Sequence, residues 1–192
     1  MKKFLLIAIC CVLCVSFGAN AKEYKGKETK ECGENLLCDL NGSLITGTVK
    51  YYYENGGLWM EIPYKKGKKE GLEKMYAETG TLAIETPYKG GKENGIEIHY
   101  DGNGNLWEEI PYKNGKEVGI AKWYYENGKL QKEISFKKGK KEGTVKIYDE
   151  NGKLLADIIT KNDEAISGFS YSKNGNQKIK IQKENLTEWL YF

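Results

Sequence analysis

The chain has 192 residues and a formal charge of +3 at pH 7, and all thirty basic residues are lysines. Arginine is the usual residue for bidentate phosphate recognition, so its absence and the small charge argue against nucleic-acid binding and dedicated phosphate chemistry. The lysines alternate with glutamates over most of the chain, which is typical of a solvated surface.

The first 21 residues predict a secretory signal peptide. Residues 1–3 are Met-Lys-Lys, residues 4–15 are an unbroken apolar run, and residues 19–21 have the small-x-small form of a cleavage site. The apolar run is too short to span a membrane. We expect cleavage near Ala21 and a protein that acts in the periplasm or outside the cell. Two lysines leave with the leader, so the charge falls from +3 to about +1.

Residues 22–40 predict an N-terminal segment that carries a cysteine pair. Cys32 and Cys38 have five residues between them, and in an exported protein such a pair favours a local disulfide. A redox pair is the alternative, although that function favours two intervening residues. Two thiols and the distant His99 do not make a zinc site.

Residues 41–180 predict an array of about six repeats. Glycines recur every 24 residues in two series, and such a period indicates a repeat architecture. The turn series is Gly56, Gly80, Gly104, Gly128 and Gly152, and the series before each first strand is Gly47, Gly71, Gly95, Gly119 and Gly143.

Each repeat contains two turn signals, which predict a hairpin. The first is Asn-Gly in most repeats, as at Asn55-Gly56, and this pair favours a tight turn in which both residues have positive φ. The second is a lysine-rich connection such as Lys65–Gly71. Helical spacing is absent. We therefore predict an all-β fold: an elongated, single-layer antiparallel β-meander, closed by a C-terminal cap at residues 181–192.

Four apolar columns predict the buried face. Leucine, isoleucine and tyrosine share one parity along the second strand of each repeat, so we expect them on one face together with a tyrosine from the first strand. In the first repeat these residues are Tyr52, Leu58, Ile62 and Tyr64. A proline column, Pro63, Pro87 and Pro111, lies late in the second strand, where we expect pairing to end or bulge.

The opposite parity carries a candidate partner-binding face. Its residues are aromatic and vary from repeat to repeat, and two interpretations stay open: burial by the curl of the sheet, or a surface for a partner. The candidate residues are Tyr51, Tyr53, Trp59, Trp107, Trp123 and Tyr125, with Met75 and His99 in the same series.

The repeats resemble a known family. Residues 119–143 have the form GxxxxYYENGKLxxEIxFKKGKKEG, which is similar to the bacterial variant of the MORN repeat. The resemblance covers about residues 41–180 and implies a long, twisted, single-layer sheet with a groove. This variant is also common in YwqK-type antitoxins, so the resemblance implies a binding protein of the immunity type.

No catalytic, metal-binding or cofactor-binding set emerges from the sequence. His99 is the one histidine, and a lone histidine in a β-ladder favours a structural or surface role. A glutamate column recurs once per repeat near many lysines, which favours cross-strand Lys–Glu pairs over paired catalytic carboxylates. This column is Glu61, Glu85, Glu109 and Glu133.

These observations predict an exported, non-enzymatic repeat protein that binds another protein through the aromatic residues. The alternatives are a structural envelope component and weak association with an anionic membrane surface. The membrane alternative rests on lysine-rich turns at residues 65–69 and 137–141, where each lysine contributes about 1 kcal/mol. Glutamates in the same turns weaken it.

Overall fold

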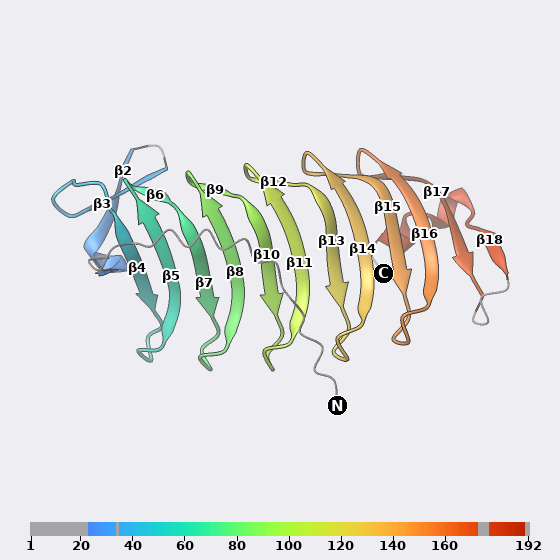
Figure 1. The fold of residues 1–192 in the computed structure, drawn as a ribbon, viewed down its shortest axis with the longest axis horizontal. Helices are drawn as coiled ribbons and strands as arrows, with labels where there is room; N and C mark the ends of the chain where they lie inside the picture. The colour runs from blue at the N-terminus through green and yellow to red at the C-terminus, as the bar shows by residue number, and fades with distance from the viewer. Residues whose placement is uncertain (1–22, 34, 173–176, 191–192) are drawn as a thin grey trace, which may run out of the picture.

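The computed structural model describes residues 23–33, 35–172 and 177–190. The predicted signal peptide, Tyr191 and Phe192 lie outside the described residues. The described chain forms one long open sheet in which strands follow one another in sequence order (Figure 1). The prediction of an all-β single-layer meander is confirmed.

Each repeat contributes two long antiparallel strands, and the register repeats from one hairpin to the next. The first strands are β4 (Gly47–Tyr52), β7 (Gly71–Tyr76), β10 (Gly95–Tyr100), β13 (Gly119–Tyr124) and β15 (Lys140–Tyr148). The second strands are β5 (Leu58–Lys65), β8 (Leu82–Lys89), β11 (Leu106–Lys113), β14 (Leu130–Lys137) and β16 (Leu154–Lys161). The short strands β6 (Lys68–Lys69), β9 (Lys92–Glu93) and β12 (Lys116–Glu117) lead into the next repeat.

The ends of the sheet are less regular. At the N-terminal end, β1 (Glu23–Lys25) pairs in parallel with β4 and continues into the 3₁₀ turn η1 (Gly26–Glu28). A separate hairpin of β2 (Thr29–Gly33) and β3 (Leu36–Asp39) carries the Cys32–Cys38 disulfide. At the other end follow β17 (Glu164–Tyr171), β18 (Lys178–Lys180) and the 3₁₀ turns η2 (Lys183–Asn185) and η3 (Glu188–Leu190).

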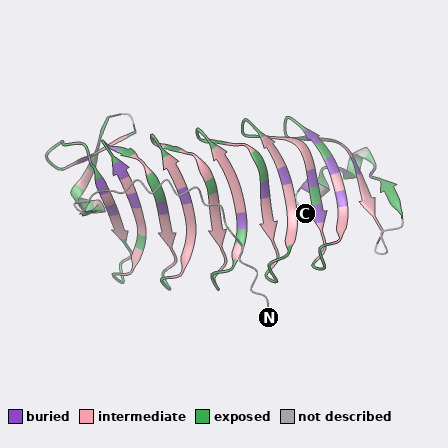
Figure 2. Cartoon of the chain, in the orientation of Figure 1, coloured by how far each residue is buried: buried purple, intermediate pink, exposed green. Residues whose placement is uncertain are grey.

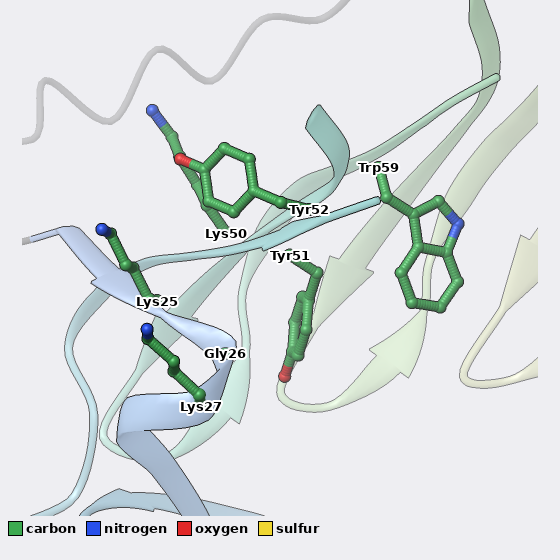
Figure 3. Close-up of a pocket in the computed structure, with 7 residues that line it drawn as sticks. All are labelled: Lys25, Gly26, Lys27, Lys50, Tyr51, Tyr52 and Trp59. Atoms are coloured by element: carbon green, nitrogen blue, oxygen red, sulfur yellow. The ribbon is translucent and has the colours of Figure 1, made fainter. Parts of the chain in front are cut away.

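A β-bulge in every repeat decides which side chains share a face. Tyr51 pairs with Met60, whereas Tyr52 pairs with Leu58, so Trp59 is an extra residue in β5. A bulge of this kind breaks the alternation of side chains, so that the extra residue Trp59 lies on the same face as the paired residues Met60 and Tyr51. The Tyr51 and Trp59 rings accordingly lie 6.3 Å apart on one side of the strands, and Tyr52 points to the other side (Figure 3).

The predicted face assignment was therefore half wrong. The isoleucine column and the last tyrosine column, which begin at Ile62 and Tyr64, do form a buried face. The tyrosine and leucine columns that begin at Tyr52 and Leu58 lie on the opposite face, because the bulge shifts the alternation by one residue. The predicted aromatic residue Tyr51 shares the buried face.

We call the face of Tyr51 and Ile62 the capped face, because the two chain ends pack onto it. At one end Ile45, Val49 and Ile62 form a core with Tyr24 of β1 and Leu37 of β3. At the other end a core of strand residues is covered by the C-terminal turns; it contains Val145, Ile147, Ala156, Ile158, Ile181, Leu186 and Leu190. Figure 2 shows that buried residues gather toward these two ends.

The opposite face, which we call the open face, links consecutive repeats by tyrosine–carboxylate hydrogen bonds. The Tyr100 hydroxyl donates to Glu85 Oε2 over 2.9 Å, and the same bond recurs along the array. The other pairs are Tyr76–Glu61, Tyr124–Glu109, Tyr148–Glu133 and Tyr171–Asp157. The expectation of Lys–Glu pairs thus missed the main partner of this column, although Lys74 Nζ also lies 3.8 Å from Glu85.

The tight turn with two residues at positive φ lies in the lysine-rich connection and not at Asn-Gly, where the sequence predicted it. At Asn55-Gly56 only the glycine has positive φ (85°), and the asparagine side chain instead accepts a hydrogen bond from the Gly57 amide. The lysine-rich connection contains the tight two-residue turn, because Lys66 (φ 50°) and Gly67 (φ 77°) both lie in the left-handed region.

The expected interruption of pairing at the prolines occurs on one side of the strand only. β5 pairs with β7 up to Glu61 and with β6 from Tyr64, whereas its ladder with β4 continues through the proline. Pro63 pairs with Thr48 inside the β4–β5 ladder, and its carbonyl accepts a hydrogen bond from the Glu70 amide. The missing proline amide costs no ladder bond, because it faces the break between β6 and β7. Gly71 is required there, since a Cβ at this residue would lie 3.0 Å from the proline ring.

Candidate binding surface

The six predicted aromatic residues have at least two different roles. Tyr53 and Tyr125 each join one repeat to the next, because their hydroxyls donate to the carbonyls of Tyr76 and Tyr148 over 2.7 Å. These bonds favour a structural role for both tyrosines. The other four residues lie on the capped face.

Tyr51 and Trp59 line a pocket of about 560 Å³ beside the N-terminal segment (Figure 3). Gly26 of η1 lies against the Tyr51 ring so closely that a Cβ at this glycine would overlap the ring. Trp59 remains 38% exposed. The N-terminal segment therefore covers part of the predicted surface and leaves the indole accessible.

Trp107 and Trp123 lie farther along the capped face and differ in exposure. Trp107 is 48% exposed, and its ring lies edge-on to His99 with centroids 6.2 Å apart. Trp123 packs against the C-terminal core and has the Lys132 ammonium 5.1 Å from its ring centroid. Trp107 is thus available to a partner, whereas Trp123 mainly supports the sheet.

Between the two capped ends, the capped face carries charged side chains where the end repeats carry apolar ones. The column of Val49 and Val145 reads Glu73 and Glu97 in the second and third repeats. Among the described elements, β7 to β13 make their extensive contacts with neighbouring strands only. The middle of this face is therefore uncovered by any described segment.

Four of these central side chains are joined to one another by hydrogen bonds or ion pairs, and Glu73 lies opposite one of them, Thr86, across the β7–β8 ladder. Glu97 accepts a 2.8 Å hydrogen bond from the Thr86 hydroxyl, and its other oxygen lies 2.9 Å from His99 Nε2. His99 Nδ1 lies 3.9 Å from Glu108. We call Glu73, Thr86, Glu97, His99 and Glu108 the central cluster. Glu73 and Glu108 are each only 8% exposed, so their side chains are crowded by their neighbours although none of the described segments covers them.

The environment changes the proton affinity of Glu97, His99 and Glu108. Burial alone would raise the pKa of Glu97, but hydrogen bonds from His99 and Thr86 hold that pKa below its usual value. The hydrogen bond to Glu97 raises the pKa of His99, with a further contribution from Glu108. Burial, together with the charge of Glu97, raises the pKa of Glu108. The cluster therefore holds negative charge that His99 only partly balances.

The sequence interpretation missed this cluster, although one signal could have found it. The column Val49, Glu73, Glu97, Ala121 and Val145 changes from apolar to acidic and back along the repeats. Such a change within a buried ladder needs a reason, because charged side chains are costly to bury. Simple alternation along the strands also kept Glu97 and Glu108 on opposite faces, so the sequence did not bring them together.

The repeats match the family model described as MORN repeat variant at residues 45–66, 69–89, 93–114, 117–138 and 141–162. The chain belongs to the MORN repeat variant family. MORN repeats commonly serve as protein-binding or membrane-binding modules and are generally non-enzymatic. This agrees with a surface that presents aromatic and charged groups.

Other comparisons add little. No curated protein matches the chain. A solved structure of an S. aureus TarM mutant in complex with fondaparinux, alpha-GlcNAc-glycerol and UDP aligns with 63% of this chain and 21% of its own, at 11% identity and a TM-score of 0.28. The chain thus spans about a fifth of that protein's length, and a likeness this weak carries no functional argument.

The described residues contain no group of three His, Cys, Asp or Glu side chains that could hold a metal ion. Within the same part of the chain, no helix is long and apolar enough to cross a membrane.

Proposed function

We propose that this MORN repeat variant protein is an exported, non-enzymatic module that binds another protein through the uncovered middle of its capped face. One observation carries the proposal: Trp107 stays 48% exposed in the uncovered middle of this face, and Trp59 stays 38% exposed beside the N-terminal segment that closes one end. Exposed tryptophans beside buried polar groups are typical of binding hot spots.

An affinity capture tests this proposal. Residues 22–192 serve as bait for envelope and secreted extracts of the source organism, beside a Trp59→Ser, Trp107→Ser double variant. A matched control carries Leu72→Ser and Ile96→Ser, since these exposed residues lie on the open face. Circular dichroism first establishes that all three proteins fold. We expect a partner that the native chain and the control retain and the tryptophan variant loses.

Loss of the partner from the control instead would move the binding site to the open face, and capture by all three proteins would remove both faces from consideration. We further propose that the partner is a toxin, as the resemblance to YwqK-type antitoxins implies. Co-expression of this chain should then relieve growth inhibition by the captured partner. Unchanged inhibition would contradict the immunity role while leaving the binding role intact.

Membrane association is the second candidate, and one observation favours it. Lys65, Lys66, Lys137 and Lys138 are exposed at turns on the same edge of the sheet (Figure 1). The Lys137 ammonium, however, lies 3.0 Å from Glu142, so part of this charge is already balanced. Sedimentation with anionic and with neutral vesicles at low salt tests the idea; equal sedimentation with both would exclude electrostatic binding.

A further inference from the structure

Two neighbouring repeats carry opposite charges at an equivalent position of the capped face: Lys69 in one repeat and Glu93 in the next. In the second repeat, the Lys69 ammonium lies 4.5 Å above the centre of the Tyr88 ring and forms an ion pair with Glu73. The chain itself therefore supplies a cation between a carboxylate and an aromatic ring. Such an arrangement combines charge pairing with a cation–π contact.

One repeat later the ring and the carboxylate are kept, but no lysine stands at the position of Lys69, and the carboxylate has His99 as its neighbour instead. Tyr112 takes the place of Tyr88 and Glu97 that of Glu73, whereas Glu93 stands where the preceding repeat has Lys69. The equivalent position after that is also acidic, with Glu117 paired to Tyr112 in the β11–β12 register. Glu117 thus lies opposite Tyr112, and the negative charges of Glu97, Glu117, Glu93 and Glu108 all act on this tyrosine.

The charge around Tyr112 is mostly negative and only partly balanced, by His99 beside Glu97 and by Lys141 near Glu117. Burial, followed by the charges of these four carboxylates, raises the pKa of Tyr112 to about 12. The pKa of Glu117 is raised as well, by burial and by the charges of Asp163 and Glu97, while Lys141 opposes the shift. A cation placed over the Tyr112 ring would meet the same groups that Lys69 meets one repeat earlier, with additional carboxylates.

We propose that the capped face docks a lysine-bearing segment of the partner protein, with one lysine ammonium over the Tyr112 ring among the four carboxylates. This inference rests on the proposed function and names the chemistry of the partner. Three features support it: the negative charge of the site, the internal example of Lys69, and the exposed Trp107 indole on the same strand. The lysine stem would contact apolar surface while its ammonium pairs with carboxylates.

The variant Glu93→Lys tests this proposal, because it places a lysine of the chain where the preceding repeat has Lys69. Its ammonium should then occupy the position over the Tyr112 ring that we assign to the partner's lysine. The control is Glu78→Lys, which makes the same charge change at an exposed turn at the other end of the strands. The probe is a fluorescein-labelled octalysine peptide, compared with the same peptide fully acetylated on its side chains. Anisotropy is measured in low salt with residues 22–192, after circular dichroism has established that each variant folds.

We expect the native chain to bind octalysine and not the acetylated peptide. Glu93→Lys should weaken binding at least about tenfold, because a charge-assisted contact over the ring is lost. Glu78→Lys should change it by less than about twofold, since the turn is solvated and screened. Equal weakening by both variants, equal binding of both peptides, or no binding of octalysine would overturn the proposal. If octalysine fails to bind while partner capture still depends on Trp107, the lysine assignment fails and the proposed function stands.

Discussion

Removal of one hydroxyl from the tyrosine–carboxylate series of the open face should measure how strongly neighbouring repeats are coupled. In Tyr100→Phe the bond to Glu85 is lost and the ring stays. A hydrogen bond to a charged group contributes about 1.5–3 kcal/mol when both partners are kept from water. The Glu85 side chain is 18% exposed, so water can replace part of the bond, and we expect a loss of about 1–2 kcal/mol.

Urea unfolding at pH 7, monitored by circular dichroism, checks this magnitude. With a slope of about 2 kcal/mol per molar, the midpoint should fall by about 0.5–1 M. Tyr52→Phe is a matched control, because Tyr52 occupies the same column in the first repeat and has no preceding repeat to supply a carboxylate. Its free energy of unfolding should change by less than about 0.5 kcal/mol.

The same variant has a predicted pH dependence. Burial and the bond to Glu85 raise the pKa of Tyr100 to about 12 in the folded state, above the ordinary tyrosine value of 10.0. The folded state keeps a proton that the unfolded state releases, so this contribution is complete below pH 10 and is lost as the pH rises to 12. The difference between native chain and variant should therefore shrink above pH 10. The reasoning is refuted if Tyr100→Phe costs no more than Tyr52→Phe at pH 7, or if the difference stays constant to pH 12.

Three further predictions concern the capped face and the turns. Glu73→Val introduces the valine of the first and fifth repeats. The free energy of unfolding in urea should stay the same or rise, because a buried ion pair rarely stabilises more than good packing. A fall in this free energy of more than about 2 kcal/mol contradicts the prediction. Gly95→Ala should lower the free energy of unfolding in urea by at least about 1 kcal/mol more than Gly128→Ala does. Both glycines have positive φ, but a Cβ added at Gly95 would lie 2.6 Å from the ring of Pro87, whereas a Cβ at Gly128 would meet nothing within contact distance. In an NMR titration the His99 ring should titrate above pH 6.5, and Glu97→Gln should lower the midpoint of that titration. The stabilising effect of the His99–Glu97 contact is complete below pH 6.5 and is lost as the pH rises through the raised pKa. An unchanged midpoint in Glu97→Gln excludes the contact.

The sequence was sufficient to predict the meander and its period, because glycines at turns and apolar residues in strands recur every 24 residues. It could not reveal which side chains share a face beyond the turn. A single extra residue such as Trp59 reverses every later alternation, and both registers fit the same pattern of residue types. The bulge is therefore visible only in the paired register of β4 and β5.

The candidate surface was predicted only in part for the same reason. Trp59 and Trp107 were chosen by residue type and do lie on the capped face, Trp107 in its uncovered middle and Trp59 beside the N-terminal segment. The acidic groups of the central cluster were not predicted. Glu97 has the parity of His99, whereas Glu108 has the parity of Leu106 and Ile110 in the next strand, so simple alternation separated two residues that the His99–Glu108 pairing brings to one face. Tyr53 looked available for binding, yet its hydroxyl is used by the next repeat, a long-range contact that spacing alone does not encode.

The direction of the tyrosine bonds has a consequence for how such a protein can change in length. Every internal repeat offers a carboxylate to the repeat after it and a hydroxyl to the repeat before it. A duplicated or deleted unit of 24 residues, such as 71–94, would therefore join its neighbours without leaving a donor or acceptor unmatched. Two strands add about 10 Å to the sheet. The span between the two capped ends could thus be lengthened or shortened in steps of that size, and the protein could be fitted to a longer or shorter partner by copy number alone.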